Sequence, residues 1–232
     1  MKAKSVILII LSCILLCLPL FTTACDSNGS QGSQELSVLP PPEPDGGPFG
    51  VDLHINVNTI DDFLTRPDVS YFDVRMFYDP AEFEAIGGIA NLTQTLPGYR
   101  IVPFPFLGTL SAMPVSGAYE GETLFEVVWG EGHEILELKP NYLESELILR
   151  EIFPRDKVIF LMCGGGGYSA LTRSLLVHQG WDENMIYNTG GNWHYDGNMA
   201  VDLTISSNNT DIATWRGDYA SIDFSNLQPI AP

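Results

Sequence analysis

Short apolar runs alternate with amphipathic segments over most of the chain after residue 50. Residues 53–57 and 69–74 are rich in β-branched and alternating apolar side chains, a pattern that favours short strands. Residues 157–162 are predicted to form a strand that is apolar without interruption after Lys157, and residues 185–188 form a further short run. Continuous apolar runs are typical of strands buried on both faces, as in parallel sheets. The pattern predicts an α/β fold with a mostly parallel central sheet flanked by helices on both faces.

Amphipathic segments between these strands predict the helices. Residues 141–153 place their apolar side chains near one helical face, and Pro154 ends the segment. Residues 170–179 repeat this spacing, with Gly180 just beyond their end. Two shorter helical segments are expected, at residues 59–64 after a cap at Asn58 or Thr59, and at residues 80–86.

One region does not follow this α/β rhythm. Residues 123–129 and 134–139 both alternate apolar and polar side chains, and a Gly-Glu-Gly-His turn joins them. Two such runs joined by a glycine-containing turn favour a β-hairpin. The sequence therefore predicts an inserted β-hairpin within about residues 108–140. Residues 100–106, which contain two prolines, are expected to form an edge strand or an extended loop.

The first 24 residues are predicted to be a signal peptide. Lys2 and Lys4 precede a nearly continuous apolar run. Thr-Thr-Ala-Cys, ending at Cys25, resembles the lipobox of bacterial lipoproteins, which implies export and a lipid anchor on the periplasmic or cell-surface side of a bacterial membrane. The alternative is an uncleaved membrane anchor, although the run is shorter than the roughly 20 residues of a typical span and contains Pro19.

Composition separates a tether from the folded domain. Residues 25–50 are rich in Ser, Gln, Gly, Pro and Asp, which is typical of a flexible tether, and the domain is expected over residues 51–232. The net charge is −18, and without Lys2 and Lys4 the remaining 9 basic and 29 acidic side chains give −20. Such an excess repels phosphate groups, which argues against a nucleic-acid partner and against binding to anionic lipid through a basic patch.

The four cysteines differ in their expected fates. Cys13 and Cys17 would leave with the signal peptide and Cys25 would carry lipid, so Cys163 would be the remaining thiol. Such a cysteine is commonly a small buried hydrophobe, but the adjoining glycine loop points to function. The four histidines lack H-x-H or H-x-x-x-H spacing, so neither a metal site nor a cofactor is expected.

The segment VIFLMCGGGGYSALTRSLLVHQG, residues 158–180, places Cys163 between a buried strand and a helix. Parallel strands bring such residues to the carboxyl edge of the sheet, where α/β folds have their sites. Four consecutive glycines can turn their amides toward one point, and the helix adds the positive end of its dipole. This surrounding is expected to favour the nucleophilic thiolate and to hold an anion or a second sulfur beside it.

Three other loop types share this layout but differ in spacing. A nucleotide P-loop needs Lys followed by Ser or Thr, where this chain has Tyr168-Ser169. A cysteine phosphatase needs Arg at the sixth position after its cysteine, which here is Ser169. Residues 165–170 fit the G-x-G-x-x-G/A dinucleotide fingerprint, but about fifty residues follow the helix, too few for the rest of such a domain.

Three ordered motifs resemble the rhodanese-like family of single-domain sulfurtransferases. They are INVNTIDDFLTRPDVSYFDVR, VIFLMCGGGGYSALTRSLLVHQGW and MIYNTGGNW, and together they extend over most of residues 55–193. Gly166 and Ser169 lie where this family usually has Gly and Ser or Thr. The resemblance implies a rhodanese-like fold for the domain.

The resemblance also implies a mechanism. Cys163 would attack a small sulfane-sulfur donor, carry the sulfur as a persulfide, and pass it to a thiol acceptor. The loop amides would stabilise the thiolate and the terminal sulfur. These amides belong to Gly164, Gly165, Gly166, Gly167, Tyr168 and Ser169.

The chain departs from the family pattern beside Ser169. The preceding residue is often Arg in the family and is Tyr168 here, which removes a cation that could hold a dianionic donor. Arg173 or Arg75 could partly replace it, although an exposed helix charge is the simpler interpretation of Arg173. Asp73 and Arg75 are expected mainly to brace the strand against the loop, and Trp193 is expected to pack in the core, with contact to substrate as the alternative.

Two further hypotheses stay open. A rhodanese-shaped binding or sensing module with little turnover would explain Tyr168 and the inserted hairpin, which could cover the loop or dock an unidentified protein partner. An inert surface domain would bury Cys163 completely. Thiol reactivity separates the three hypotheses.

Overall fold

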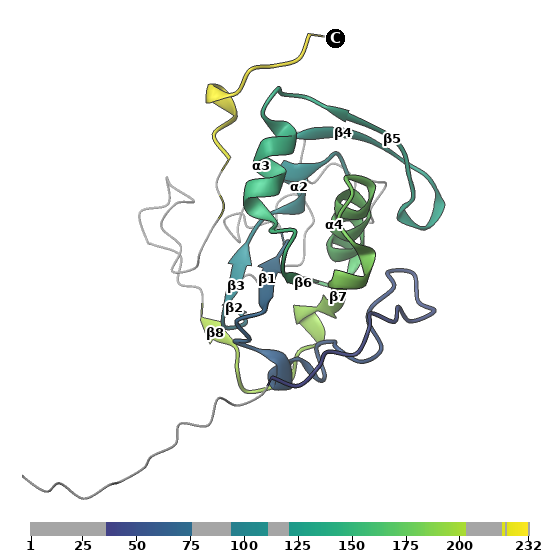
Figure 1. Cartoon of the computed structure of the whole chain (residues 1–232), viewed down its shortest axis with the longest axis vertical. Helices are drawn as coiled ribbons and strands as arrows, with labels where there is room; N and C mark the ends of the chain where they lie inside the picture. The colour runs from purple at the N-terminus through teal and green to yellow at the C-terminus, as the bar shows by residue number, and fades with distance from the viewer. Residues whose placement is uncertain (1–35, 76–93, 111–120, 203–219, 221, 232) are drawn as a thin grey trace, which may run out of the picture. The chain divides into compact units, whose positions relative to one another are not determined.

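The computed structural model describes residues 36–75, 94–110, 121–202, 220 and 222–231 (Figure 1). The predicted signal peptide, Cys25 and the helix expected at residues 80–86 lie outside the described residues. Leu39–Pro232 form one compact unit, and the candidate site lies within it.

The central sheet has the strand order β3-β1-β6-β7, and every neighbouring pair is parallel (Figure 1). The strands are β1 (Val69–Asp73), β3 (Tyr99–Ile101), β6 (Val158–Cys163) and β7 (Ile186–Gly191). The two inner strands, β1 and β6, are almost entirely buried, as continuous apolar runs require. The prediction of an α/β fold with a mostly parallel central sheet is confirmed.

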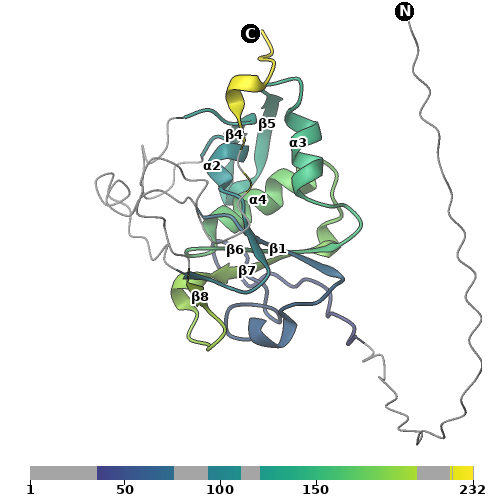
Figure 2. The ribbon, with the colours of Figure 1, turned by 90° about the vertical axis from the view of Figure 1, so that its left-hand side faces the viewer.

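One face of the sheet is covered by α3 (Ser145–Ile152) and α4 (Gly167–His178) (Figure 2). The Phe72 ring of β1 lies 4.5 Å from that of Phe153, just after α3. Leu171 and Leu175 of α4 are fully buried in the same apolar cluster. The short α2 (Phe104–Leu107) packs beside them. The helices predicted at residues 141–153 and 170–179 are therefore present with shifted ends.

The opposite face is covered by a single 3₁₀ turn, η1 (Ile60–Phe63), and the irregular chain around it (Figure 2). Ile55 and Ile60 are buried there against Phe160 and Tyr187 of the sheet. Thr59 precedes the turn as predicted, but its hydroxyl bonds the His54 carbonyl instead of capping the helix. The described part of this face therefore carries no α-helix.

The inserted hairpin is present as β4 (Phe125–Trp129) and β5 (Ile135–Pro140), joined by the 3₁₀ turn η2 (Glu131–His133). Alternate residues of β4 are buried because one face of the hairpin packs on the helical layer. Thr109 fixes its position, since the Thr109 hydroxyl accepts the Val127 amide at 2.7 Å and its carbonyl accepts the Trp129 indole at 2.7 Å. The predicted hairpin is confirmed.

The remaining elements are short. They are β2 (Gln94–Thr95), β8 (Val201–Asp202), η3 (Glu183–Met185), η4 (Asn192–His194) and η6 (Phe224–Asn226). β2 and β8 pair antiparallel in a separate two-stranded sheet. Residues 100–106, expected to be an edge strand or extended, form the end of edge strand β3 and most of α2.

The strand predicted at residues 53–57 is wrong. The Asp52 carboxylate accepts the amides of His54 and Ile55, at 2.9 and 2.6 Å, and this turn takes the place of strand pairing. Val57 then donates to the Thr189 carbonyl at the end of β7. Burial of Ile55 and Val57 produces the alternating pattern without a strand.

Residues 39–52, named the strap here, pack against the domain instead of forming part of a loose tether. The Tyr187 hydroxyl donates to the Pro40 carbonyl at 2.5 Å, and Asp52 donates its amide to the Asn188 carbonyl at 2.8 Å. Burial raises the pKa of Tyr187 to about 12, so this hydroxyl keeps its proton. The Leu53 amide, directly after the strap, donates to the Glu43 carbonyl within it. The folded domain therefore begins near Leu39, not at residue 51.

Candidate functional site

Cys163 is the last residue of β6 and lies at the carboxyl edge of the sheet, beside Gly191 of β7. The thiol is 2 % exposed and belongs to the apolar cluster beneath α4. It is a free cysteine. The strand delivers it to the position predicted from the sequence, but it is deeper than a substrate-facing thiol needs to be.

The loop after Cys163 turns one amide onto the sulfur. The Gly166 N–H donates to Cys163 Sγ at 3.0 Å. Gly166 has a φ of +99°, which residues other than glycine rarely adopt, and it directly precedes α4. The first bond within α4 runs from the Ala170 amide to the Gly166 carbonyl, so the amides of the first turn lie at the positive end of the helix. The Gly166 amide is thus a direct donor to the sulfur, whereas a contribution from the other loop amides stays a prediction.

Ser169, in the first turn of α4, has a hydroxyl that makes no hydrogen bond within the described residues. Its side chain is completely buried. A buried hydroxyl without a partner is destabilising, because its lost hydration is not replaced. This group in the first turn of α4, six residues after Cys163, is a candidate contact for a bound molecule.

Trp193, in η4, covers the start of the loop. The Trp193 amide donates to the Gly164 carbonyl at 3.1 Å, and its ring lies against Gly164 and Gly165. A Cβ on Gly164 would lie only 2.5 Å from the indole, so this position has no room for a side chain. Trp193 is 53 % exposed, so the expectation that it packs in the core is wrong.

The strap covers the other end of the loop. Phe49 and Val51 lie against Gly166, at 3.4 and 3.2 Å from the position that its Cβ would take. The Asn188 side-chain amide donates both to the Phe49 carbonyl, at 2.8 Å, and to the Gly166 carbonyl, at 3.1 Å. The Phe49 ring also contacts the His133 ring of the hairpin turn, with 5.8 Å between centroids. The strap therefore contacts both the loop, at Gly166, and the hairpin turn, at His133.

Asp73 and Arg75 form a buried ion pair whose further hydrogen bonds reach β2 and η4, while bracing of the Cys163 loop itself stays a prediction. Both side chains are 3 % exposed or less, and the Arg75 Nε donates to the Asp73 carboxylate at 2.9 Å. Arg75 also donates to Asn192 at 3.1 Å, next to Trp193, and Thr95 donates to Asp73 at 2.8 Å. The pair ties the end of β1 to β2 and to the turn that carries Trp193.

Arg173 does not approach the loop. Its guanidinium lies 3.4 Å from the Ile186 carbonyl and 3.7 Å from Glu183. Ile186 begins β7, whereas the residue beside Cys163 is Gly191, at the other end of that strand and roughly 16 Å away. The expectation that Arg173 could replace the missing loop cation is wrong, because the helix carries it to the amino edge of the sheet.

The Tyr168 ring packs on the apolar cluster and lies 6.0 Å from the Phe104 ring of α2. Tyr168 thus serves the contact between α2 and α4.

Sequence reasoning missed Phe49, Val51 and Asn188. Phe49 and Val51 lie in a segment whose Pro and Gly content indicates a tether, and their contacts join residues more than one hundred positions apart. The one signal in the sequence is a Phe-Gly-Val run directly after the proline-rich stretch.

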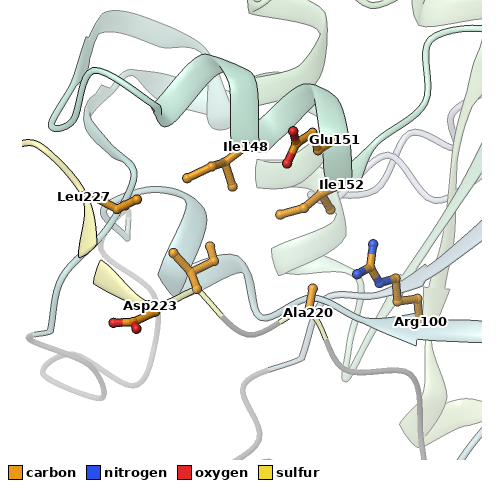
Figure 3. Close-up of a pocket in the computed structure, with 8 residues that line it drawn as sticks. Arg100, Ile148, Glu151, Ile152, Ala220, Asp223 and Leu227 are labelled. Atoms are coloured by element: carbon orange, nitrogen blue, oxygen red, sulfur yellow. The ribbon is translucent and has the colours of Figure 1, made fainter. Parts of the chain in front are cut away.

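The structure also has a cavity of about 420 Å³ away from Cys163 (Figure 3). It lies between α3 and the C-terminal segment and is lined by Arg100, Ile148, Glu151, Ile152, Ala220, Ile222, Asp223 and Leu227. None of these is a predicted site residue. The loop at Cys163, in contrast, is closed over by apolar side chains.

Within the described residues, no three His, Cys, Asp or Glu side chains gather closely enough to hold a metal ion. No helix in this part of the chain is both long and apolar enough to cross a membrane. No protein-family model, no curated protein and no solved structure matches the chain.

Proposed function

We propose that the chain is a rhodanese-like sulfurtransferase that carries sulfane sulfur on Cys163. The observation that carries the proposal is the Gly166 amide, which donates to Cys163 Sγ at 3.0 Å where a parallel strand ends and α4 begins. An amide donor and a helix N-terminus both stabilise negative charge on sulfur. The order of motifs along residues 55–193 agrees with this family.

The proposed reaction has two balanced steps. In the first, the Cys163 thiolate attacks the outer sulfur of a donor R–S–SH; the new S–S bond forms, the old one breaks, and R–S⁻ leaves. In the second, an acceptor thiolate attacks the outer sulfur of the Cys163 persulfide, forming R′–S–SH and restoring the Cys163 thiolate. The loop amides would stabilise the charge that develops on sulfur in both steps.

Ser169 would take part in the persulfide state. Its buried hydroxyl makes no hydrogen bond within the described residues, and a second sulfur in the loop would offer it an acceptor. Trp193 and Phe49 must shift before a donor enters, because the thiol is 2 % exposed. Such movements of loops over a site are ordinary parts of catalytic cycles.

Sulfur transfer by the purified domain tests the proposal. The domain is incubated with a persulfide donor and with cyanide as acceptor, and thiocyanate is measured. The wild type is expected to show turnover that Cys163→Ser abolishes, while the exposed-site control Ser225→Ala keeps it. Turnover that persists in Cys163→Ser contradicts the proposal.

A binding or sensing module is the second candidate, and the burial of the sulfur favours it. Cys163 lies in the apolar cluster and Arg173 lies at the far edge of the sheet. A module of this kind would bind a partner through the surface near the hairpin without turnover. Alkylation of Cys163 at several pH values separates the candidates: a sulfur carrier reacts readily in the folded state, whereas a structural thiol reacts only after unfolding.

The location of the protein is part of the proposal. A lipid on Cys25 would anchor the exported domain to a bacterial membrane, as the Thr-Thr-Ala-Cys motif suggests. Fractionation of cells tests this, because Cys25→Ala is expected to release the protein from the membrane fraction.

A further inference from the structure

The two ends of the Cys163 loop are covered by apolar side chains from separate segments. On one side, the Trp193 ring lies against Gly164 and Gly165. On the other, Phe49 and Val51 of the strap lie against Gly166, whose amide bonds the sulfur. A donor that reaches Cys163 must therefore pass between aromatic and aliphatic groups.

The charges around this entrance are negative. The strap, residues 39–52, contains Glu43, Asp45 and Asp52 and no Lys or Arg. The hairpin turn places Glu131 and Glu134 on either side of His133, which contacts Phe49, and residues 130–138 contain no Lys or Arg. Negative surroundings repel anions and lower their local concentration.

Arg75 and Arg173, which were expected to replace the missing cation beside Ser169, do not offset this negative charge. Arg75 is paired with the fully buried Asp73 and donates to Asn192. Arg173 lies against Ile186 and Glu183 at the opposite edge of the sheet.

We infer that Phe49 and Trp193 form an aromatic gate that selects a donor with an apolar carrier group, and that thiosulfate and other donors with charged carriers are poor substrates. This inference rests on the proposed function. An apolar carrier replaces the contacts that Phe49 and Trp193 make with the glycines, whereas a charged carrier would lose water without gaining a partner. The sulfur moves from R–S–SH to Cys163 with release of R–S⁻, as above.

Two matched donors test the selectivity. Benzyl persulfide and 4-carboxybenzyl persulfide differ by one carboxylate, and thiosulfate provides the dianion. Formation of the Cys163 persulfide is followed by intact mass. Benzyl persulfide is expected to react fastest, by about tenfold or more at low ionic strength, with a smaller difference in high salt. Equal or faster loading from thiosulfate overturns the gate and leaves the proposed function standing, whereas no persulfide with any donor overturns the proposed function itself.

Variants of the gate provide a second measurement. Phe49→Ala is expected to slow loading from benzyl persulfide about tenfold and to leave the slow reaction of thiosulfate unchanged. Leu53→Ala is the matched control, since Leu53 follows the strap directly and is 51 % exposed. Near-UV circular dichroism checks that both variants fold. If Phe49→Ala speeds both donors equally, Phe49 is only a cover and the gate is overturned.

Discussion

At the scale of single residues, the site depends on a few buried polar groups within an apolar setting. Gly166 supplies the amide that bonds Cys163, and Asn188 holds both Gly166 and Phe49 by their carbonyls. Asp73 and Arg75 hold the turn that carries Trp193. Each of these groups would be destabilising without its partner, so each should be sensitive to substitution.

Asp73→Asn tests the buried ion pair. The substitution leaves the Arg75 charge buried without its counter-ion and is expected to lower the free energy of unfolding by about 3–5 kcal/mol. The control is Glu137→Gln in the exposed pair with Lys139, where little or no change is expected because solvent screens the pair. Urea unfolding of both variants measures the difference. Equal effects would show that Asp73 does not brace the fold.

At the scale of elements, the loop, the strap and the hairpin turn pack together at the N-terminal end of α4. The loop has a left-handed residue at Gly166, and the hairpin turn has one at Gly132. These two positions differ in their surroundings, because Gly166 touches the strap and Gly132 has nothing within 4 Å of its Cβ position. The pair therefore separates backbone strain from contact with the strap.

Gly166→Ala is expected to be more damaging than Gly132→Ala. Both substitutions add the left-handed strain of about 1–2 kcal/mol. At Gly166 the new methyl group would also push Val51 and Phe49 away, and the sulfur would lose its amide contact. Thermal unfolding and Cys163 alkylation measure the two effects. Similar losses in the two variants would mean that the strap does not rest on the loop.

The stability of the domain is expected to depend on pH through His133 in the hairpin turn. Burial lowers the pKa of His133 below its ordinary value of 6.5. The unfolded state therefore binds the proton more readily, and stability falls as the pH drops through this range. Above about pH 7.5 the neutral form prevails in both states and this loss is absent.

His133→Asn removes this titration and keeps a residue that tolerates the positive φ of 65°. The loss of stability between about pH 7.5 and 5.5 is expected to be smaller in this variant than in the wild type. Ser225→Ala, at an exposed residue without a titrating side chain, should follow the wild type. If the pH dependence of stability is the same in His133→Asn and in the wild type, His133 is not the source of the loss.

At the scale of the whole molecule, the strap makes the domain larger than its composition indicates. A high Pro and Gly content predicts the flexibility of an isolated segment. It does not predict the hydrogen bonds that Tyr187 and Asn188 donate to carbonyl groups of the strap. A domain beginning at Leu39 is expected to be more stable than one beginning at Val51, by about 2–4 kcal/mol. Equal stability of the two forms would show that the strap is dispensable.

The sequence predicts the parts of the fold that periodicity determines. The uninterrupted apolar run ending at Cys163 is strand β6, because both of its faces are buried, and the two alternating runs before Pro140 are the hairpin. Residues 53–57 were misread as a strand because burial of Ile55 and Val57 gives the same alternation in a turn held by Asp52. Local patterns do not report contacts between distant segments.

The candidate site is predictable to a similar degree. Its thiol, its glycine loop and the bracing role of Asp73 and Arg75 follow from local motifs. The positions of Arg173 and Phe49 do not, because they depend on the direction of α4 and on the path of the strap across β7.

The mass of the purified, unreduced domain after exposure to benzyl persulfide tests the central claim most directly. The account predicts that the protein gains one sulfur atom at Cys163, that cyanide removes it, and that Cys163→Ser gains none. A folded protein that stays at its original mass with every donor would contradict the account.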